Sequence, residues 1–393
     1  MILRVSQRPE DRYASLAVSS DWKLDVLRTA RALVIGAGAL GNEVCKNLGM
    51  LGVKHITVVD MDEVEVSNLT RSVFFRAADR GKPKAEVLAE RVRDLNPDVA
   101  VWPVVGPIPR ALGLGVVRRA DMVFSCLDNR AARLALNLMC HRVGRPWVDG
   151  SMEDLDGEVA VYAPGTGGCY RCTLTDTDIQ IVTTRFACNH VAAQAAAAGK
   201  VPTTSTMGSI IAALQVQEAI KIHQGDLRRS LAGKRLLVNG RVNDFFPVAV
   251  DARPGCEAHE SYGTVTEVPE WTAAGTTGRE VLDRFRADTG TVGELCLGFD
   301  LVVGLTCASC GAAQTWADVE RSPVRADRAV CPACGALGNL TGTGWVAGAD
   351  PWAGLPLTRL SVPPLEVLKV VSETETRWYE LTGDLATLPP TIR

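Results

Sequence analysis

The sequence lacks a long apolar segment and carries little net charge. No apolar run reaches the roughly 18 residues that a helix needs to span a bilayer, so we expect no membrane association. The formal net charge is -3, which argues against a nucleic acid and against an anionic membrane surface as partners. The first residues contain no apolar signal-peptide core, and we therefore expect a cytoplasmic protein.

Low-complexity tracts are also missing, and a doubled C-x-x-C pair is the only internal repeat. Hydrophobic residues make up 47% and charged residues 22% of the 393 residues, which is ordinary for a globular protein. A chain of this length holds two or three domains and a substantial core.

Disulfide bonds are not expected either, although the chain contains 12 cysteines. The thiols of a cytoplasmic protein stay reduced. Three C-x-x-C pairs have instead the spacing that is typical of thiolates bound to zinc. Four other cysteines lie in apolar sequence and are expected to be small core residues: Cys45, Cys126, Cys140 and Cys296.

Short apolar runs alternate with amphipathic stretches between residues 31 and 149. The expected strands are 31–35, 55–59, 99–105, 121–125 and 146–149. The expected helices are 22–29, 40–51, 84–95 and 129–143. This alternation predicts an α/β fold with a doubly wound, Rossmann-like, mostly parallel sheet that helices cover on both faces.

The pattern changes after Gly150. An outlying antiparallel strand is expected over 158–163. Residues 173–207 are expected to form a crossover loop, which is the best candidate for a mobile functional segment. An apolar helix is expected over 208–224, and two further strands follow around 234–239 and 242–250.

Near residue 260 the composition shifts toward Gly, Thr and Pro with short strands. We therefore expect two domains, a first of residues 1–259 and a smaller, β-rich C-terminal domain of residues 260–393. The second domain is expected to contain a helix over 278–289 and an inserted zinc ribbon over 302–345.

A glycine-rich motif, Gly36-Ala37-Gly38-Ala39-Leu40-Gly41, follows a strand and opens a helix. Its glycines permit a tight turn and close backbone approach, and the helix N-terminus favours a phosphate. Asp60 ends the next strand, where a carboxylate can hold a ribose hydroxyl. Alone, these features describe any Rossmann protein, and an NAD-dependent oxidoreductase is the default interpretation.

Three further motifs make the pattern more specific. Residues 60–71 read D-M-D-E-V-E-V-S-N-L-T-R, residues 81–84 read G-K-P-K, and residues 126–129 read C-L-D-N. In order and spacing they resemble the adenylation core of the ubiquitin-activating family, which includes ThiF, MoeB and HesA. The resemblance covers roughly residues 10–260 and implies an ATP-dependent activating enzyme.

Adenylation moves AMP onto a carboxylate and releases pyrophosphate, so the site must neutralise a triphosphate and hold Mg²⁺. Arg71 and Lys84 supply fixed positive charge for the phosphates, and Asn68 can donate to phosphate oxygens. Asp128, at a strand's carboxyl end, is the expected magnesium ligand, with Asn129 at the cap of the next helix. A hydride-transfer enzyme would have little use for such an Arg and Lys pair. The resemblance places Asp60 on the ribose and includes Asp62 in the same nucleotide site.

The N-terminal segment departs from the family pattern. The family commonly carries an arginine, three residues beyond the Arg of an Arg-Tyr pair, that reaches a partner subunit's ATP. Here the pair is Arg12-Tyr13, and Ser15 stands at the expected place. Arg12 or Arg8 is a candidate to replace the family's N-terminal arginine. Ser72 likewise follows Arg71 where Gln is usual. A homodimer is still what the resemblance implies.

Cys169-Tyr170-Arg171-Cys172 matches a C-Y-R-C that the same family uses as half of a tetrahedral zinc site. The family's second half is another C-x-x-C after the last strands of the adenylation domain. Here Cys256 and His259 stand at that place. Zinc accepts a Cys₃His set, so we infer a structural site from these four residues.

Cys307-Ala-Ser-Cys310-Gly and Cys331-Pro-Ala-Cys334-Gly form two knuckles typical of a zinc ribbon. The glycine after each pair lets backbone amides turn back toward the thiolates. Four protein ligands leave no open position, which indicates a structural metal. Mixed pairing, with Cys169 and Cys172 joining one knuckle, remains an alternative.

Cys188 lies in the crossover region, ahead of a P-T-T motif at residues 202–204. Thioester-forming relatives carry their nucleophile in this region. Attack on an acyl-adenylate needs a thiolate, and Arg185 or His190 can lower the thiol pKa. The alternatives are that Cys188 packs in a short helix and that His190 is a solvated loop residue.

We therefore predict adenylation of the C-terminal glycine of a ubiquitin-like protein, then thioester formation on Cys188 and transfer to a conjugating enzyme. Alternatives are a sulfur-carrier adenylyltransferase of the thiamin or molybdopterin type without an enzyme thioester, and a non-catalytic nucleotide-binding scaffold. The expected cofactors are ATP, Mg²⁺ and two structural Zn²⁺ ions. The C-terminal domain contains no catalytic constellation, and a docking role rests on analogy alone.

Overall fold

Alternating strands and helices in the first part of the chain build one eight-stranded sheet. This computed structural model describes residues 12–14, 16, 23–179, 203–321 and 326–393. The strand order is β3-β2-β1-β4-β5-β6-β7-β8. The five strands from β3 to β5 run parallel, and β6, β7 and β8 extend the sheet in antiparallel fashion.

The strands of this sheet are β1 (Arg31–Ile35), β2 (His55–Asp60), β3 (Ala100–Val105), β4 (Met122–Ser125), β5 (Trp147–Glu153), β6 (Asp156–Tyr162), β7 (Lys234–Asn239) and β8 (Asp244–Ala249). The α-helices that accompany it are α1 (Leu24–Thr29), α2 (Ala39–Leu51), α3 (Lys84–Leu95), α4 (Leu114–Arg119), α5 (Arg130–Arg142), α6 (Tyr170–Thr173) and α9 (Ser205–His223).

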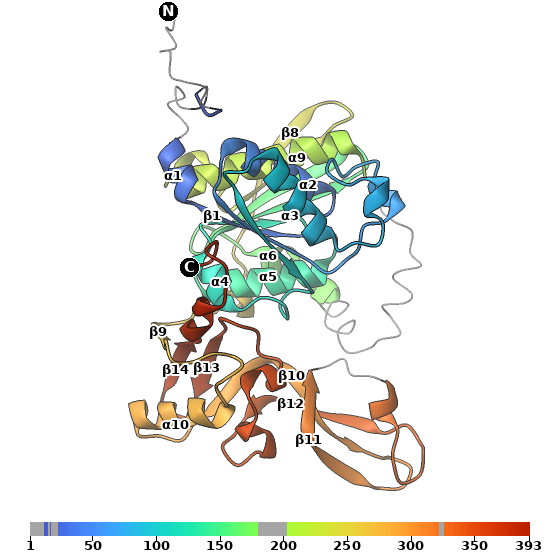
Figure 1. Cartoon of the computed structure of the whole chain (residues 1–393), viewed down its shortest axis with the longest axis vertical. Helices are drawn as coiled ribbons and strands as arrows, with labels where there is room; N and C mark the ends of the chain where they lie inside the picture. The colour runs from blue at the N-terminus through green and yellow to red at the C-terminus, as the bar shows by residue number, and fades with distance from the viewer. Residues whose placement is uncertain (1–11, 15, 17–22, 180–202, 322–325) are drawn as a thin grey trace, which may run out of the picture.

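Helices cover both faces of the sheet, which confirms the predicted fold class. Helices α2, α3 and α9 lie over one face, and α4 and α5 lie over the other (Figure 1). Each face has its own apolar cluster. The parallel strands supply both clusters because their neighbouring residues point to opposite faces, as Val34 and Ile35 of β1 do.

The strand predicted over 158–163 is antiparallel but not outlying. It forms β6 inside the sheet, paired with β5 on one side and β7 on the other. The β7–β8 hairpin extends the sheet beyond it, and this long-range pairing leaves no local mark in the sequence. Helix α4 was not predicted, because six residues are too few to establish a helical period.

A second sheet of six strands follows, with the order β11-β10-β13-β14-β9 and with β12 paired to β10. Its elements are β9 (Val265–Glu267), α10 (Gly278–Thr289), β10 (Glu294–Thr306), β11 (Ala313–Arg321), β12 (Asn339–Val346), β13 (Val367–Val371) and β14 (Thr376–Glu380). Short 3₁₀ helices are η1 (Val66–Asn68), η2 (Ala77–Asp79), η3 (Leu227–Arg229), η4 (Glu257–His259), η5 (Ala326–Ala329), η6 (Pro351–Gly354), η7 (Leu357–Leu360) and η8 (Thr382–Ala386).

The C-terminal part packs directly against the α4 side of the first sheet. Leu365, Leu388 and Ile392 belong to the same apolar cluster as the strands and helices of that face. The fully buried carboxylate of Glu380 pairs with Arg118 and Arg119 of α4. This interface is therefore part of the folded core rather than a loose contact.

Three of the four cysteines expected in the core are buried, namely Cys45, Cys126 and Cys140. Cys296 in β10 is only partly buried, which corrects the expectation for that residue. Among the described residues, no helix combines the length and apolar character needed to cross a membrane.

Candidate functional site

The glycine loop connects β1 to α2 at the carboxyl edge of the parallel strands. Gly36 has a φ of +100°, and a Cβ on it would lie 2.4 Å from the Cys126 carbonyl oxygen. A Cβ on Gly41 would lie 1.9 Å from the Gly36 carbonyl oxygen. These two glycines are required by the tight turn and by its contact with the loop after β4.

Gly38 has a different role because a Cβ there would meet nothing within 4 Å. It is the N-cap residue of α2, and no side chain caps this helix. Backbone N–H groups at an uncapped helix N-terminus are ready donors for an anion. The loop can therefore receive a phosphate at Gly38, while Gly36 and Gly41 shape the turn around it.

Asp60 ends β2 beside this loop. Its Oδ2 accepts a hydrogen bond from the Ala37 amide at 2.6 Å, and its Oδ1 accepts one from the Asp62 amide at 2.7 Å. Burial raises the pKa of the Asp60 carboxyl, while the two amides and Lys84 act in the opposite direction. A carboxylate oxygen has more than one lone pair, so this fixed group can still accept from a ribose hydroxyl.

Lys84 begins α3 and brings a positive charge to the same edge. Its Nζ lies 2.9 Å from Oδ2 of Asp62, and its backbone N–H donates to the Asp62 carbonyl oxygen at 2.9 Å. The Lys84 side chain is 12% exposed, against 56% for that of Asp62. The structure thus brings Asp60, Asp62 and Lys84 together, although they come from two separate motifs.

Asn68 and Arg71 lie on η1 and on the turn that follows it. Asn68 is buried, and its Oδ1 accepts from the Glu65 amide at 2.9 Å. Its Nδ2 is therefore the end that can donate to a phosphate. Arg71 donates from Nη1 to the Ser67 carbonyl oxygen at 2.8 Å, which uses one edge of its guanidinium fork to order this turn.

Asp128 and Asn129 follow β4, where both residues are exposed. Asn129 is the N-cap of α5, since its Oδ1 accepts from the Ala132 amide at 2.8 Å. Its Nδ2 lies 3.3 Å from Oδ1 of Asp128. The helix cap therefore also orients the Asp128 carboxylate, an oxygen ligand of the kind that Mg²⁺ prefers.

A buried ion pair that no sequence motif predicted lies beneath these two residues. Arg133 Nε lies 3.1 Å from Oδ1 of Asp149, and both side chains are almost fully buried. Arg133 Nη2 also donates to the carbonyl oxygens of Leu127, at 2.6 Å, and Gly150, at 3.2 Å. Burial raises the pKa of the Asp149 carboxyl, and Arg133 opposes that rise. Arg133 thus ties the Asp128 loop to the middle of β5.

A sequence signal for Arg133 was present, because it lies one helical turn beyond the Asn129 cap on the same face of α5. Its partner Asp149 comes from a different strand, and no local pattern connects the two residues.

Cys188 lies outside the described residues, as do Arg185 and His190. The described ends of the crossover segment do, however, lie beside the site. Asp178 forms an ion pair with Arg130, in the first turn of α5. Thr203 forms a bridge with Asp154, just after β5. Asp178 and Thr203 therefore both lie near the carboxyl edge of the parallel strands.

The N-terminal Arg12-Tyr13 pair lies at the opposite edge of the sheet. Arg12 Nη1 donates to the carbonyl oxygen of Leu95, the last residue of α3, at 3.3 Å. Tyr13 is buried, and its hydroxyl accepts from Nδ2 of Asn96 at 2.6 Å. Arg12 is therefore not close to the candidate nucleotide site of its own chain. Ser15 and Arg8 lie outside the described residues.

One group of candidate metal ligands consists of Cys169, Cys172, Cys256 and His259, whose ligand atoms all lie within 4.8 Å of one another. The Cys169 Sγ lies 3.8 Å from the Sγ atoms of both Cys172 and Cys256. The Cys172 Sγ lies 3.4 Å from Nε2 of His259. Sulfurs bound to a tetrahedral zinc at about 2.3 Å are separated by about 3.8 Å, so this geometry fits zinc.

The second group consists of Cys307, Cys310, Cys331 and Cys334. The Sγ atoms of Cys307 and Cys334 lie 3.5 Å apart, and those of Cys310 and Cys331 lie 3.7 Å apart. Backbone amides of its knuckle lower the pKa of the Cys307 thiol to about 6. The two groups are separate in space, so the structure gives no support to mixed pairing.

The ThiF family model matches residues 11–258. The chain is 33% identical over 262 residues to pig "Adenylyltransferase and sulfurtransferase MOCS3", covering 66% of this chain and 54% of that protein. It is also 33% identical over 258 residues to the Thermus thermophilus "Sulfur carrier protein adenylyltransferase", covering 63% of this chain and 88% of that protein. The chain thus spans only about half the length of the pig relative.

Among solved structures, that of Escherichia coli MccB with ATP aligns with a TM-score of 0.54. The alignment covers 65% of this chain and 75% of that one, at 22% identity. A likeness at this identity shows the fold alone. The matched family region includes all the candidate nucleotide-site residues described above and ends just before the second sheet begins.

Proposed function

The chain belongs to the ThiF family, and on that premise we propose that it adenylates the C-terminal carboxylate of a small ubiquitin-like carrier protein. The observation that carries this proposal is the gathering of an uncapped helix N-terminus, Asp60 and Lys84 at one edge of the parallel sheet. Ligands of open α/β sheets bind at this carboxyl edge.

In this proposal ATP is held with its ribose on Asp60 and its phosphates over Gly38, Arg71 and Lys84. A carboxylate oxygen of the carrier attacks the α-phosphorus and forms the acyl-adenylate bond. The bond to the β-phosphate breaks, and pyrophosphate leaves with the electron pair. Arg71 and Lys84 stabilise negative charge as it develops on the phosphates. Mg²⁺, held by Asp128, supplies further charge neutralisation when it is bound.

We also propose that both thiolate groups hold structural zinc. The sulfur separations in each group are those of a tetrahedral site, and each group offers four protein ligands. The first site would link the segment after β6 to the segment after β8. The second would close the two knuckles of the ribbon.

We propose that Cys188 then accepts the acyl group. Its sulfur forms the thioester as the bond between the carrier's carbonyl carbon and AMP breaks, and a conjugating enzyme receives the carrier in turn. The support for this step is positional. Cys188 belongs to the crossover segment of residues 173–207, and two described residues of that segment, Asp178 and Thr203, contact elements of the nucleotide edge.

A second candidate is sulfur-carrier adenylation without an enzyme thioester. The names of the pig and Thermus relatives favour it. Adenylation is common to both candidates, and only the fate of the acyl group differs. A non-reducing gel distinguishes the two candidates. An ATP-dependent, thiol-sensitive adduct that disappears in Cys188→Ala supports the thioester. Adenylation without such an adduct supports the second candidate.

We further propose a homodimer formed through β8. This strand ends the sheet, and all six of its residues are exposed. Phe245 is 49% exposed, Phe246 51% and Val248 40%. An uncovered apolar edge strand pairs readily with another chain, and a two-fold interface between identical subunits is the commonest arrangement. Analytical ultracentrifugation tests this, since Phe245→Glu is expected to give a monomer.

ATP–pyrophosphate exchange tests the adenylation step itself. Lys84→Ala is expected to reduce the exchange rate at least roughly a hundredfold, because one fixed charge on the phosphates is lost. Lys54→Ala is the matched control. Lys54 is an exposed lysine before β2, at the opposite edge of the sheet, and its variant is expected to keep the parent rate. Equal rates in both variants, or no exchange in the parent with any candidate carrier, would reject the proposal and leave a nucleotide-binding scaffold.

A further inference from the structure

Helix α5 carries a stripe of polar side chains that leads away from the Asp128 loop. Arg133, Asn137 and His141 follow one another at intervals of four residues, so they lie on one face of the helix. Asn137 is fully buried, and His141 is 7% exposed. Buried polar side chains need partners, and this stripe leads to the first ligand group. That group consists of Cys169, Cys172, Cys256 and His259.

Asn137 connects the stripe to the cysteine end of the first ligand group. Its Oδ1 accepts a hydrogen bond from the Tyr170 amide at 3.0 Å. Its Nδ2 is buried, and among the described residues no nitrogen or oxygen atom accepts from it. Burial raises the pKa of the Cys169 thiol to about 12, and an interaction with the Asn137 side chain opposes that rise. A Cys169 thiolate would give this buried N–H the acceptor that it lacks.

His141 contacts the histidine of the same group. Its ring is stacked on that of His259, with the ring centroids 5.1 Å apart and the planes inclined by 21°. Nε2 of His259 lies 3.4 Å from the Cys172 Sγ. Partners outside the ligand set fix the orientation of a ligating imidazole. A cysteine in place of His259 would offer no ring for this contact, so His141 suits the Cys₃His set of this chain.

Arg133 brings the stripe to the loop that carries Asp128. Its Nη2 donates to the Leu127 carbonyl oxygen at 2.6 Å. Burial lowers the pKa of the Arg133 guanidinium, but Asp149 and then Tyr170 raise it above its ordinary value by stabilising the cation. Tyr170, which lies between two of the cysteines, thus supports the side chain that holds this loop.

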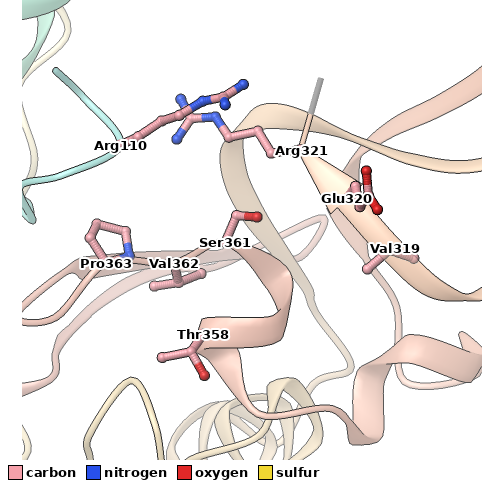
Figure 2. Close-up of a pocket in the computed structure, with 8 residues that line it drawn as sticks. All are labelled: Arg110, Val319, Glu320, Arg321, Thr358, Ser361, Val362 and Pro363. Atoms are coloured by element: carbon pink, nitrogen blue, oxygen red, sulfur yellow. The ribbon is translucent and has the colours of Figure 1, made fainter. Parts of the chain in front are cut away.

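Figure 2 shows a different contact, where the loop before α4 meets the end of β11. Arg110 and Arg321 extend toward each other there, and none of the labelled residues belongs to α5. The apolar face of α5 packs in the cluster of the sheet through Leu136, Met139 and Cys140. The polar face depends instead on the first ligand group, whose ligand atoms lie within 4.8 Å of one another. Thiolates this close repel each other unless a cation lies between them.

We propose that Asn137 and His141 are positioning residues, which connect the first ligand group, when zinc occupies it, to the Asp128 loop. This inference rests on the zinc occupancy proposed above. With zinc bound, Cys169 and His259 are fixed, and Asn137 and His141 are fixed with them. A helix of 13 residues is about 20 Å long, and as a rigid element it transmits this constraint to the loop at its other end.

Zinc release from the full chain to a chromogenic chelator tests the contacts around the first ligand group. Asn137→Leu and His141→Leu are each expected to speed the release of one of the two proposed ions about tenfold or more, since partners of this kind support metal affinity. The ion of the second group serves as the internal reference. His141→Phe keeps a stacked ring and is expected to release zinc like the parent. Arg130→Ala, on the same helix but 59% exposed, is the matched control.

Amide hydrogen exchange of residues 127–133, measured by mass spectrometry, tests the connection with the loop. Cys172→Ser and Asn137→Leu are expected to lose protection there. Cys310→Ser, which removes a ligand of the second group alone, is expected to keep it. His141→Leu, in the last turn of the helix, keeps the test decisive if Asn137→Leu does not fold.

Faster release from the first group, together with lost protection of residues 127–133, supports the inference. Two zinc ions in the parent, with release rates that Asn137→Leu and His141→Leu leave unchanged, overturn it. Unchanged protection in Cys172→Ser overturns it as well. A parent whose zinc content does not fall in Cys172→Ser refutes the proposed occupancy together with this inference, so the two failures are distinguishable.

Discussion

Gly38 and Gly41 belong to the same loop, yet a methyl group would meet different surroundings at each. At Gly41 it would lie 1.9 Å from a backbone oxygen, whereas at Gly38 it would meet nothing within 4 Å. Gly41→Ala must therefore distort the loop, and we expect it to cost about 1–3 kcal/mol of stability. Gly38→Ala is expected to leave stability within about 0.5 kcal/mol and to weaken ATP binding by filling the space over the helix N-terminus.

Urea denaturation and nucleotide titration of the two variants measure these effects separately. An unchanged ATP affinity in Gly38→Ala would mean that phosphates do not lie over this position. The outcome for Gly41→Ala serves as the internal control, since its stability loss follows from the turn alone.

Among single residues, the sequence predicts those site residues that belong to a local motif. Asp60 and Lys84 were identified from their motifs, and the structure brings them to one edge. The Arg133–Asp149 pair was missed because Asp149 belongs to another strand.

Among the elements, the strands and helices of the first sheet were predicted closely. The expected bounds of β1 and α3 agree with the structure, because each has a clear apolar pattern and a distinct start. Helix α4 has only six residues, and its burial depends on Leu365 and its neighbours from the C-terminal part. Tertiary contacts stabilise such a short helix, and its own sequence shows no hydrophobic period that would predict it.

Arg133 connects α5 to β5 and to the loop after β4, so its loss is expected to affect the placement of the whole helix. Arg133→Ala leaves Asp149 buried without its partner, and we expect a loss of about 3–5 kcal/mol. The variant also loses the hydrogen bond from Arg133 to the Leu127 carbonyl oxygen, which holds the Asp128 loop. The magnesium concentration needed for half-maximal pyrophosphate exchange is therefore expected to rise. Arg130→Ala, in the first turn of the same helix and 59% exposed, should cost less than about 0.5 kcal/mol. Equal magnesium dependence in the two variants would contradict the positioning role.

The two thiolate groups are predicted to hold one zinc ion each. Cys172→Ser and Cys310→Ser should each reduce the zinc content, measured by mass spectrometry of the digested protein, from about two ions per chain to about one. Cys296→Ser is the control, since Cys296 belongs to neither group. Zinc content that Cys310→Ser leaves unchanged would argue against a ribbon site.

In the whole molecule, the interface between the two sheets contains a titratable group, Glu366. Its Oε1 accepts from the amides of Leu114, at 3.2 Å, and Val367, at 2.9 Å. Burial raises the pKa of the Glu366 carboxyl from 4.5 to about 7, although Arg142 and Arg321 oppose the rise. The folded state therefore holds this proton more tightly than the unfolded state does.

Because the folded pKa is the higher one, this contribution to stability is fully present below pH 4.5 and is lost as the pH rises through about 7. Glu366→Gln keeps the acceptor oxygen and removes the titration. We expect the variant to match the parent near pH 4.5 and to exceed its stability by about 1–3 kcal/mol at pH 8. Denaturant titrations at the two pH values measure this, and a difference that does not change with pH would place Glu366 in a polar environment.

The predicted domain boundary at residue 259 remains a proposal. Residues on both sides of it contribute to one apolar cluster, and Glu380 pairs with α4 across the interface. We propose that residues 260–393 fold as a part fixed to the adenylation domain. The sequence predicts the change in composition at this point, but it contains no signal for the contact between the two parts.

Direct detection of the adenylated carrier tests the central claim most closely. The chain is incubated with ATP, Mg²⁺ and a candidate ubiquitin-like protein, and intact-mass spectrometry follows the carrier. We predict a carrier heavier by one AMP, formed only when its C-terminal glycine is present and abolished by Lys84→Ala. No AMP on any candidate carrier, together with a melting temperature that NAD raises and ATP does not, would contradict the account and point to a Rossmann oxidoreductase.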